Sequence, residues 1–545
     1  MTRRARRASI SLLMALFALA TSASAPAADR GERPFPRGFL WGTAIAGFQA
    51  EAGGPAVNAD PHSDWWQWVR DPSNIAAGRV SGDLPENGPG HWQAYRRDIA
   101  LARRRLHTGA LRFSIEWSRI FPRSTAAVTL GRRPTIAQLR GLDALADQGA
   151  VRHYRAVLGE LRRRQMAAFV TVSHFSLPTW IHDPIMVRDT LAGVAPDADL
   201  PAIPAPAGWL DDASVAEFAK YAAYLGWRFG DLVDTWAPIN EPVVVTSSGY
   251  VNVPGVLAGN FPPGVFSYTA AAKVLNNLVL ANAAAYDALK ATDRGDADGD
   301  RRRARVGVVH NMVSFTPADP RSTLDVAGTR DADRLFNRLF LDAVVRGQVD
   351  ADADGRIAPS ERIARLRAKA DFIGVNYYLR ARVTGLGAPL STRIRLLTFA
   401  PRLSYRTPHS PDAPPCPTRC SDLGWEIHVP GLRGALKAAG AYGLPVYITE
   451  NGIADADDDQ RSAFLVAHLT QLRRAMADGL ADVRGYFHWA LTDNLEWSSG
   501  YAPKFGLYAY DPTTLARTER VSASVFACIA RANQVPPDLA RRCAR

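Results

Sequence analysis

The stretch VYITENG, residues 446–452, decides the fold of this chain. The β-branched and aromatic residues that open it predict a buried strand, and Asn451-Gly452 predicts a turn directly after that strand. Glu450 therefore stands at the carboxyl end of the strand, which is where α/β barrels carry their catalytic groups. A single acid in this position could equally be a paired structural residue of the core.

A second stretch, LVDTWAPINEP at residues 232–242, repeats this arrangement. An apolar strand pattern is followed by Asn240 and Glu241, and then by Pro242, which ends the strand. Two carboxylates at the ends of two strands, far apart in the sequence, suit an acid/base and a nucleophile that act on a glycosidic bond.

Strand patterns alternate with helical patterns from about residue 38 to residue 530, and no Ser/Gly-rich linker divides them. The eight strand patterns lie at residues 38–46, 111–117, 168–174, 232–239, 304–311, 371–378, 445–449 and 483–489. The chain has 545 residues, 47% of them hydrophobic, which is enough to bury one large core. We therefore predict an α/β protein with a single (β/α)8 TIM barrel and enlarged loops.

Polar side chains near the strand ends have two interpretations each. Arg112 lies inside an apolar strand and needs an anionic partner, for which a catalytic carboxylate is one candidate. Gln49 follows the first strand and would either cap a turn or bond two hydroxyls of a sugar ring. His174 ends the third strand, a position more often taken by a hydrogen-bonded core histidine than by a catalytic one.

The segment WALTDNLEW, residues 489–497, places Glu496 between Trp489 and Trp497. The tryptophans would serve core packing alone or would help to bind a sugar. Sugars need a flat apolar surface on one side and hydrogen-bonding groups on the other, which aromatic faces beside carboxylates supply.

Six short motifs occur in one order along the chain. They are FLWGTA (39–44), RFSIEWSRIFP (112–122), INEP (239–242), GVNYY (374–378), ITENG (448–452) and DNLEW (493–497). As a set they resemble glycoside hydrolase family 1 over nearly the whole chain. The wording of EWSRIFP, LPTWIHDP and FPPG is most similar to the archaeal-type β-glycosidases of that family.

This resemblance implies a retaining β-glycosidase that acts on terminal, non-reducing β-D-glucosides, galactosides or fucosides through a covalent glycosyl-enzyme intermediate. Glu241 would be the acid/base and Glu450 the nucleophile, with carboxyl groups about 5 to 5.5 Å apart. Arg112 and Asn376 would support the nucleophile. The residues implied in substrate binding are Gln49, His174, Asn240, Tyr378, Trp425, Trp489, Glu496 and Trp497. A small β-glycoside or an oligosaccharide is the expected substrate, and catalysis would need no cofactor.

Two alternatives stay open. A transglycosidase has the same residues and differs only in how well water competes with an acceptor sugar. A non-catalytic sugar-binding relative usually lacks one carboxylate, whereas both are present in this chain.

Residues 350–361 read DADADGRIAPSE, which matches the twelve-residue calcium loop of an EF-hand, with Gly355 at its sixth position. Segments 332–345 and 360–370 are predicted as flanking helices. The alternative is a solvated acidic loop. A calcium ion here would stabilise a loop of the barrel. The candidate ligands are Asp350, Asp352, Asp354, Arg356 and Glu361.

The N-terminus has four arginines by position 7, an apolar run at 10–20, and small residues up to 28. This pattern predicts a signal peptide over residues 1–28, with 29–545 as the catalytic domain, and a secreted or periplasmic protein. A twin-arginine signal fits less well. The apolar run is too short for a stable anchor, so we expect no membrane association after cleavage.

The cysteines are an even set of four, as expected for two disulfides in an exported protein. Three pairings are possible, and the local ones, Cys416 with Cys420 and Cys528 with Cys543, are the simplest. The formal charge is +12, but no basic face interleaved with aromatic residues is visible, so we expect no nucleic-acid binding. The sequence leaves the oligomeric state open.

Overall fold

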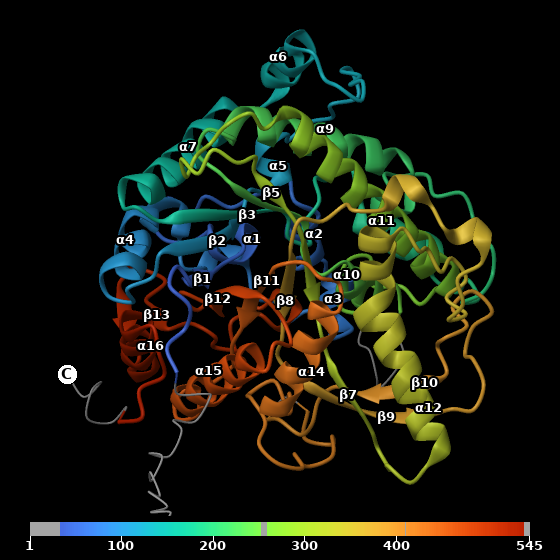
Figure 1. Cartoon of the computed structure of the whole chain (residues 1–545). Coiled ribbons are helices and arrows are strands. Elements are labelled where there is room, and N and C mark those ends of the chain that lie inside the picture. The colour runs from blue at the N-terminus through green and yellow to red at the C-terminus, as the bar shows by residue number, and fades with distance from the viewer. Residues whose placement is uncertain (1–32, 252–258, 409, 539–545) are drawn as a thin grey trace, which may run out of the picture.

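A computed structural model describes residues 33–251, 259–408 and 410–538 of the chain. All eight predicted strands form, and they run parallel in one sheet with the order β5-β4-β3-β2-β1-β12-β11-β8-β6. The strands are β1 Leu40–Ala44, β2 Ala110–Ser114, β3 Ala167–Ser173, β4 Thr235–Ile239, β5 Arg305–Val306, β6 Val308–Asn311, β8 Ile373–Asn376, β11 Val446–Asn451 and β12 Val483–Trp489. The predicted (β/α)8 barrel is confirmed (Figure 1).

The fifth barrel strand is split into β5 and β6 at Gly307. The first piece pairs with β4 and the second with β8, and a parallel bridge from Asn240 to Val309 joins β4 to β6, which closes the barrel. A Cβ at Gly307 would lie 2.5 Å from the ring of Phe372. Glycine therefore lets the two neighbouring strands approach here.

Long helices between the strands cover the outside of the barrel (Figure 1). They are α4 His91–Arg104, α7 Gln148–Arg163, α9 Ala213–Phe229, α11 Tyr268–Thr292, α14 Val429–Gly440, α15 Arg461–Ala477 and α16 Val521–Ala532. Shorter helices lie in the enlarged loops: α1 Gly47–Ala50, α2 Asp64–Trp68, α3 Pro72–Ala76, α5 Trp117–Ile120, α6 Ile136–Leu145, α8 Pro184–Leu191, α10 Pro242–Tyr250, α12 Thr323–Ala332 and α13 Leu339–Leu341.

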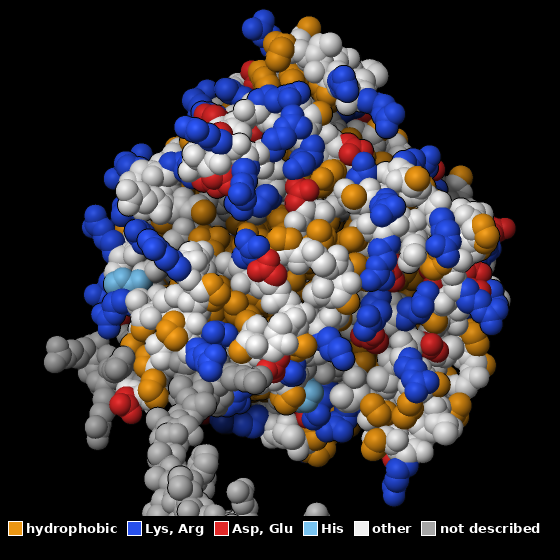
Figure 2. Space-filling view, in the orientation of Figure 1, with side chains coloured by type: hydrophobic (Ala, Val, Ile, Leu, Met, Phe, Trp, Pro, Cys, Tyr) orange, Lys and Arg blue, Asp and Glu red, His pale blue; other side chains and the backbone are white. Residues whose placement is uncertain are grey.

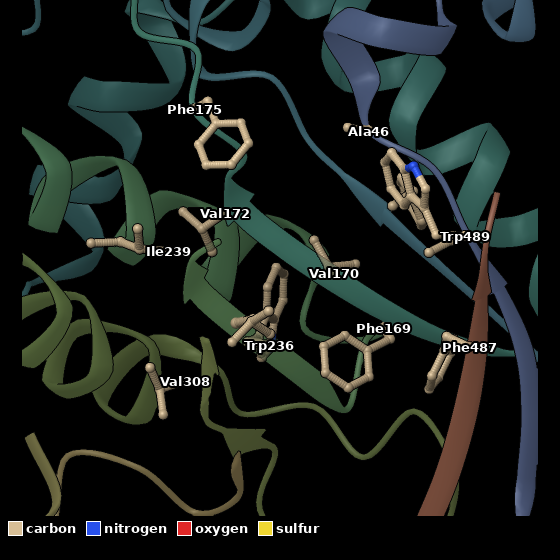
Figure 3. Close-up of a cluster of buried hydrophobic side chains, with 14 of the residues drawn as sticks. Ala46, Phe169, Val170, Val172, Phe175, Trp236, Ile239, Val308, Phe487 and Trp489 are labelled. Atoms are coloured by element: carbon tan, nitrogen blue, oxygen red, sulfur yellow. The ribbon is translucent and has the colours of Figure 1, made fainter. Parts of the chain in front are cut away.

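Large apolar side chains from several strands fill the barrel. Figure 3 shows Phe169 of β3 near Phe487 of β12, and their ring centroids are 5.4 Å apart. Phe372, beside β8, contacts the other side of Phe169 at 5.3 Å. Trp236 of β4 is fully buried, and its indole N–H donates to Asp293. This core holds the strand ends, and the polar groups they carry, in fixed positions.

A second sheet of three strands lies beside the barrel. Its strands are β7 Ser314–Pro317, β9 Arg380–Gly385 and β10 Phe399–Arg402, in the order β10-β9-β7. Helix α12 packs on it, and Ala332, Val383 and Phe399 form a separate small apolar cluster there. Both β9 and β10 belong to the Pro-rich segment 379–423, whose structure the sequence patterns did not predict. A third sheet pairs β13 Tyr508–Tyr510 with β14 Arg517–Glu519.

The disulfide between Cys416 and Cys420 is confirmed, with Cα atoms 6.1 Å apart. Cys528 is also disulfide-bonded, while Cys543 and the predicted signal peptide lie outside the described residues. None of the helices in the described ranges is long and apolar enough to cross a membrane. In Figure 2 the Lys and Arg side chains of the visible face are spread among acidic and apolar ones.

We predict that Gly307→Ala lowers the stability of the protein by about 1 to 3 kcal/mol, because the added methyl group meets the ring and backbone of Phe372 in a packed core. The matched control is Gly434→Ala in helix α14, where an added Cβ has open space and alanine is the better helix former. Thermal unfolding of the three proteins checks this prediction, and it is wrong if Gly307→Ala unfolds no earlier than Gly434→Ala.

Candidate active site

Glu450 lies at the end of β11, almost fully buried, and both of its carboxylate oxygens accept hydrogen bonds. Arg112 of β2 donates to Oε1, and the hydroxyl of Tyr378 donates to Oε2 at 2.6 Å. Arg112 thus has the anionic partner that the sequence demanded. A buried guanidinium and a hydroxyl together hold both oxygens of this carboxylate in place.

Glu241 lies after β4 as the N-cap of α10, with φ of 47°, a conformation that non-glycine residues adopt mainly at functional or strained positions. Its Oε1 accepts from the amides of Asn376 at 2.6 Å and Asn311 at 3.1 Å. Burial, followed by the charge of Glu450, raises the pKa of Glu241 to about 8. The two carboxyl groups therefore differ: Glu241 holds a proton at neutral pH, whereas Glu450 accepts hydrogen bonds from Arg112 and Tyr378.

The position of Asn376 corrects one expectation. We expected it to support Glu450, but its side-chain amide donates to Glu241 and, at 3.2 Å, to Asn240. Its carbonyl oxygen accepts from the hydroxyl of Thr449, the neighbour of Glu450. The pairing of β8 with β11 does bring Asn376 beside Glu450, but the amide points towards the other carboxyl group.

Asn240 connects the two carboxylates to the rest of the site. Its Oδ1 accepts from Arg112 at 2.6 Å, and its Nδ2 lies 3.1 Å from Nε2 of His174. Burial, and next the charge of Arg112, lowers the pKa of His174 well below its usual value, so the ring is neutral and accepts at Nε2. His174 also stacks on Trp489 and Trp497. The structure therefore places it in the site rather than in the core alone.

Glu496 and Gln49 form a polar corner at the inner end of the site. The amide nitrogen of Gln49 donates to the carbonyl of Leu495 at 2.7 Å and contacts Glu496 Oε2 at 3.5 Å. Burial, followed by the charges of Glu450 and Glu241, raises the pKa of Glu496 to about 8. Oε1 of Gln49 is buried without a hydrogen-bond partner among the described residues, so a ligand hydroxyl would satisfy it.

These residues surround one cavity of about 430 Å³, a size typical of small-molecule sites. Trp425 lies at its far side, edge to face with Tyr378 at 5.7 Å between ring centroids. The predicted site residues that line the cavity are His174, Asn240, Glu241, Tyr378, Trp425, Glu450, Trp489, Glu496 and Trp497. Arg112 and Asn376 act from behind this lining, through the hydrogen bonds described above, and Gln49 contacts its member Glu496.

The sequence did not single out two residues that the structure brings into the site. Asn311, the last residue of β6, binds Glu241, and its position at a strand end was the available signal. Glu116 follows β2, where it accepts from the hydroxyls of Ser114 at 2.6 Å and of Ser176. Ser114 in turn accepts from the backbone N–H of Gly47 at 2.7 Å. Glu116 thereby joins the loops that carry Gln49 and His174.

The predicted calcium loop is compact. Carboxylate oxygens of Asp350, Asp352 and Glu361 lie within 4.8 Å of one another, and Gly355 has φ of 84° at the sharp turn. Asp354 is outside this group and accepts from the backbone N–H of Arg356 at 2.7 Å.

One part of the EF-hand expectation was wrong. The segment before the loop is helical, in π and α turns from Asp333 to Arg346. The segment after it forms only two 3-10 turns, Pro359–Glu361 and Ala364–Leu366, because Arg362 and Ile363 take extended conformations. An antiparallel bridge from Gln348 to Arg362 closes the loop instead of a second helix.

A parallel barrel with two buried carboxyl groups at its strand ends, beside aromatic faces and in one cavity, is typical of a glycoside hydrolase. The Glycosyl hydrolase family 1 model matches residues 31–185 and 199–535. The chain belongs to this family and is therefore a retaining β-glycosidase.

Relatives match over nearly their full length. The chain is 38% identical over 518 residues to a β-galactosidase of Pyrococcus woesei, covering 92% of this chain and 98% of the relative. It is 28% identical over 520 residues to β-glucosidase A of Thermotoga maritima, covering 92% and 98%. The solved β-glycosidase of Thermosphaera aggregans superposes with a TM-score of 0.78 at 36% identity, over 94% of this chain and 99% of that one.

We predict that Glu241→Gln makes the protein more stable than wild type at pH 9 and not at pH 4. Between pH 4.5 and about 8 the unfolded chain releases the proton of Glu241 while the folded protein keeps it, so wild type loses stability as the pH rises through this range. Glutamine has no proton to lose. Melting temperatures across pH measure the difference, with the exposed Asp300→Asn as control. A constant offset between wild type and variant at all pH values would contradict the prediction.

Proposed function

We propose that this enzyme hydrolyses terminal, non-reducing β-D-glucosides, β-D-galactosides or β-D-fucosides, with Glu450 as the nucleophile and Glu241 as the acid/base. The observation that carries the proposal is the contrast between the two carboxyl groups. Glu450 is bound by Arg112 and Tyr378, whereas burial raises the pKa of Glu241 to about 8.

The two steps follow from this contrast. Glu450 attacks the anomeric carbon while Glu241 gives its proton to the departing oxygen, which leaves as an alcohol. Glu241, now ionised, takes a proton from water, which attacks the same carbon and frees Glu450. Two inversions retain the β-configuration. The separation of about 5 to 5.5 Å between the carboxyl groups, the value for retaining enzymes, stays a prediction.

The inner end of the cavity favours an unmodified sugar. Glu496 and the unpaired Oε1 of Gln49 accept hydrogen bonds, and Trp489 and Trp497 offer flat apolar faces. Hydroxyl groups suit these acceptors, whereas none of the described lining residues is a Lys or Arg that could pair with a 6-phosphate. The relatives named as β-galactosidase and β-glucosidase support glucose and galactose as the first sugars to test.

We predict that Glu450→Gln lowers kcat on aryl β-D-glycosides about 10⁴-fold or more, because the covalent step is lost. Glu241→Gln should lower it about 10²- to 10⁴-fold on poor leaving groups, but should leave a rapid first step with dinitrophenyl glycosides, which depart without a proton. Steady-state and burst kinetics on a panel of glucoside, galactoside and fucoside measure both effects. No turnover by folded wild type on any of them would favour a sugar-binding protein instead.

We further propose that the loop 350–361 binds a structural calcium ion. Asp350, Asp352 and Glu361 offer converging carboxylates, and hard oxygen donors are what calcium takes. Asp350 also accepts from the backbone N–H groups of Asp354 and Gly355, which keeps the loop in its turn. The ion would stabilise the connection between the helical segment at 333–346 and β8, away from the catalytic carboxylates.

We predict that calcium raises the melting temperature of wild type and does not change the melting temperature of the double variant Asp350→Asn/Glu361→Gln. Calcium at 100 times its Kd would add about 2.7 kcal/mol to the free energy of unfolding. The control is Asp457→Asn, in a different acidic loop. The measurement compares thermal unfolding in EDTA and in calcium, and an equal shift in all three proteins would contradict a site in this loop.

We also propose that the protein is exported. The support is the N-terminal pattern of arginines, apolar run and small residues, together with the disulfide between Cys416 and Cys420, since disulfides persist mainly in oxidising compartments. The N-terminal sequence of the protein recovered from its native host tests this, with a start at or near residue 29 as the expected result.

A further inference from the structure

The cavity of the active site continues well beyond the two carboxylates. Its lining includes Glu496 and Trp497, Trp425, and residues of the segment 390–404. We call the part beside Glu496 and Trp497 the inner end, and the part beside the segment 390–404 the outer part. The outer part is lined by aliphatic and phenyl side chains from α10, α11, β7, the helical turn at 333–338, β10 and the segments that connect them. Those used below are Phe315, Leu335, Leu390, Leu397, Phe399 and Leu403.

Charge is distributed unevenly along this cavity. The ionised or ionisable acids among its described lining residues, Glu241, Glu450 and Glu496, lie at the inner end, and none of the described lining residues is Lys, Arg or Asp. The whole chain contains 65 Lys and Arg and 53 Asp and Glu. The outer part of the cavity is therefore unusually free of charge for this protein, and its polar side chains are mainly hydroxyls such as those of Thr246, Ser247 and Ser404.

The apolar side chains that line the outer part of the cavity form what we call the apolar wall, and several of them are held by packing contacts of their own. Phe399 belongs to the small apolar cluster with Ala332 and Val383, and Phe315, Leu335 and Leu397 pack against that cluster. Four of the side chains that face the cavity are thus fixed by the sheet of β7, β9 and β10 and by the helical segment after α12. Because these side chains are close-packed, the apolar wall keeps its shape.

The reaction geometry decides what enters this outer part. The sugar ring belongs at the inner end and the bond to be broken belongs between Glu241 and Glu450, so the leaving group must extend towards Trp425 and the apolar wall. A second sugar there would place many hydroxyls against a surface with few partners, which is costly. An apolar group would instead gain from burial.

We propose that the preferred substrates are β-glycosides of extended apolar alcohols, with alkyl chains or fused rings as the leaving group, rather than oligosaccharides. This inference rests on the proposed function, because that function sets the direction of the substrate. The segment 379–423, which carries much of the wall, is then the part of the chain that selects the leaving group.

The test is a series of n-alkyl β-D-glycosides, from methyl to octyl, with the sugar that the aryl panel ranks first. Each added methylene should raise kcat/KM about two- to fourfold until the wall is covered, because burial of a methylene favours binding to that extent. The corresponding disaccharide with a second glucose should have a kcat/KM at least tenfold below that of the octyl glycoside. All substrates are used below their critical micelle concentrations.

The matched variants are Leu390→Ser/Leu403→Ser and Leu386→Ser. Leu390 and Leu403 line the cavity and lie outside the packed clusters of the described residues, so their replacement should leave the fold intact. Leu386 is exposed like Leu390 but is not among the described lining residues. The double variant should lose about half of the gain in kcat/KM that each added methylene gives in wild type. Leu386→Ser should behave as wild type.

Two outcomes overturn the inference while leaving the enzyme a β-glycosidase. One is an active wild type whose kcat/KM does not change with chain length, or which turns over the disaccharide as well as the octyl glycoside. The other is a gain per methylene that the double variant keeps in full. If no glycoside of any kind is turned over, the proposed function itself fails, and this inference fails with it.

Discussion

The buried hydrogen bonds between Arg112, Glu450 and Asn240 are the constraint on which the site depends. A guanidinium inside a barrel is tolerable only with an anion and further acceptors around it. Glu450 supplies the anion and Asn240 the second acceptor, so β2, β4 and β11 are fixed relative to one another by the same bonds that orient the nucleophile. The charge of Glu450 in turn contributes to the raised pKa of Glu241.

The raised pKa values of these carboxyl groups lower the stability of the fold at neutral pH. Glu241 and Glu51, the latter at the end of helix α1, are buried, and Glu496 is half-buried. Each has a pKa of about 7 to 8, so the folded protein keeps protons that the unfolded chain would release at neutral pH. Their concentration at the carboxyl ends of the barrel strands fits a site that gives up stability for reactivity.

Strands and strand-end residues were predictable from sequence because each short apolar run ends in a polar residue and a turn. All eight strands form, and Arg112 contacts Glu450 as expected. The direction of a side-chain amide at a strand end was not predictable from the sequence. Asn376 lies next to Glu450 through strand pairing, yet its amide donates to Glu241. That direction depends on residues from other strands, which the local sequence pattern does not contain.

The segments that sequence patterns predicted poorly are those whose structure depends on distant partners. The second flank of the loop 350–361 has helix-compatible residues but forms 3-10 turns, because Gln348 pairs with Arg362 and closes the loop early. Residues 380–385 form β9 beside β7, which comes from another part of the chain, and residues 399–402 form β10 by pairing with β9. These non-local contacts also build the outer wall of the cavity. The residues that carry out the family's chemistry therefore lie at the strand ends. The selection of the leaving group depends instead on the segment 379–423, which the short motifs do not cover.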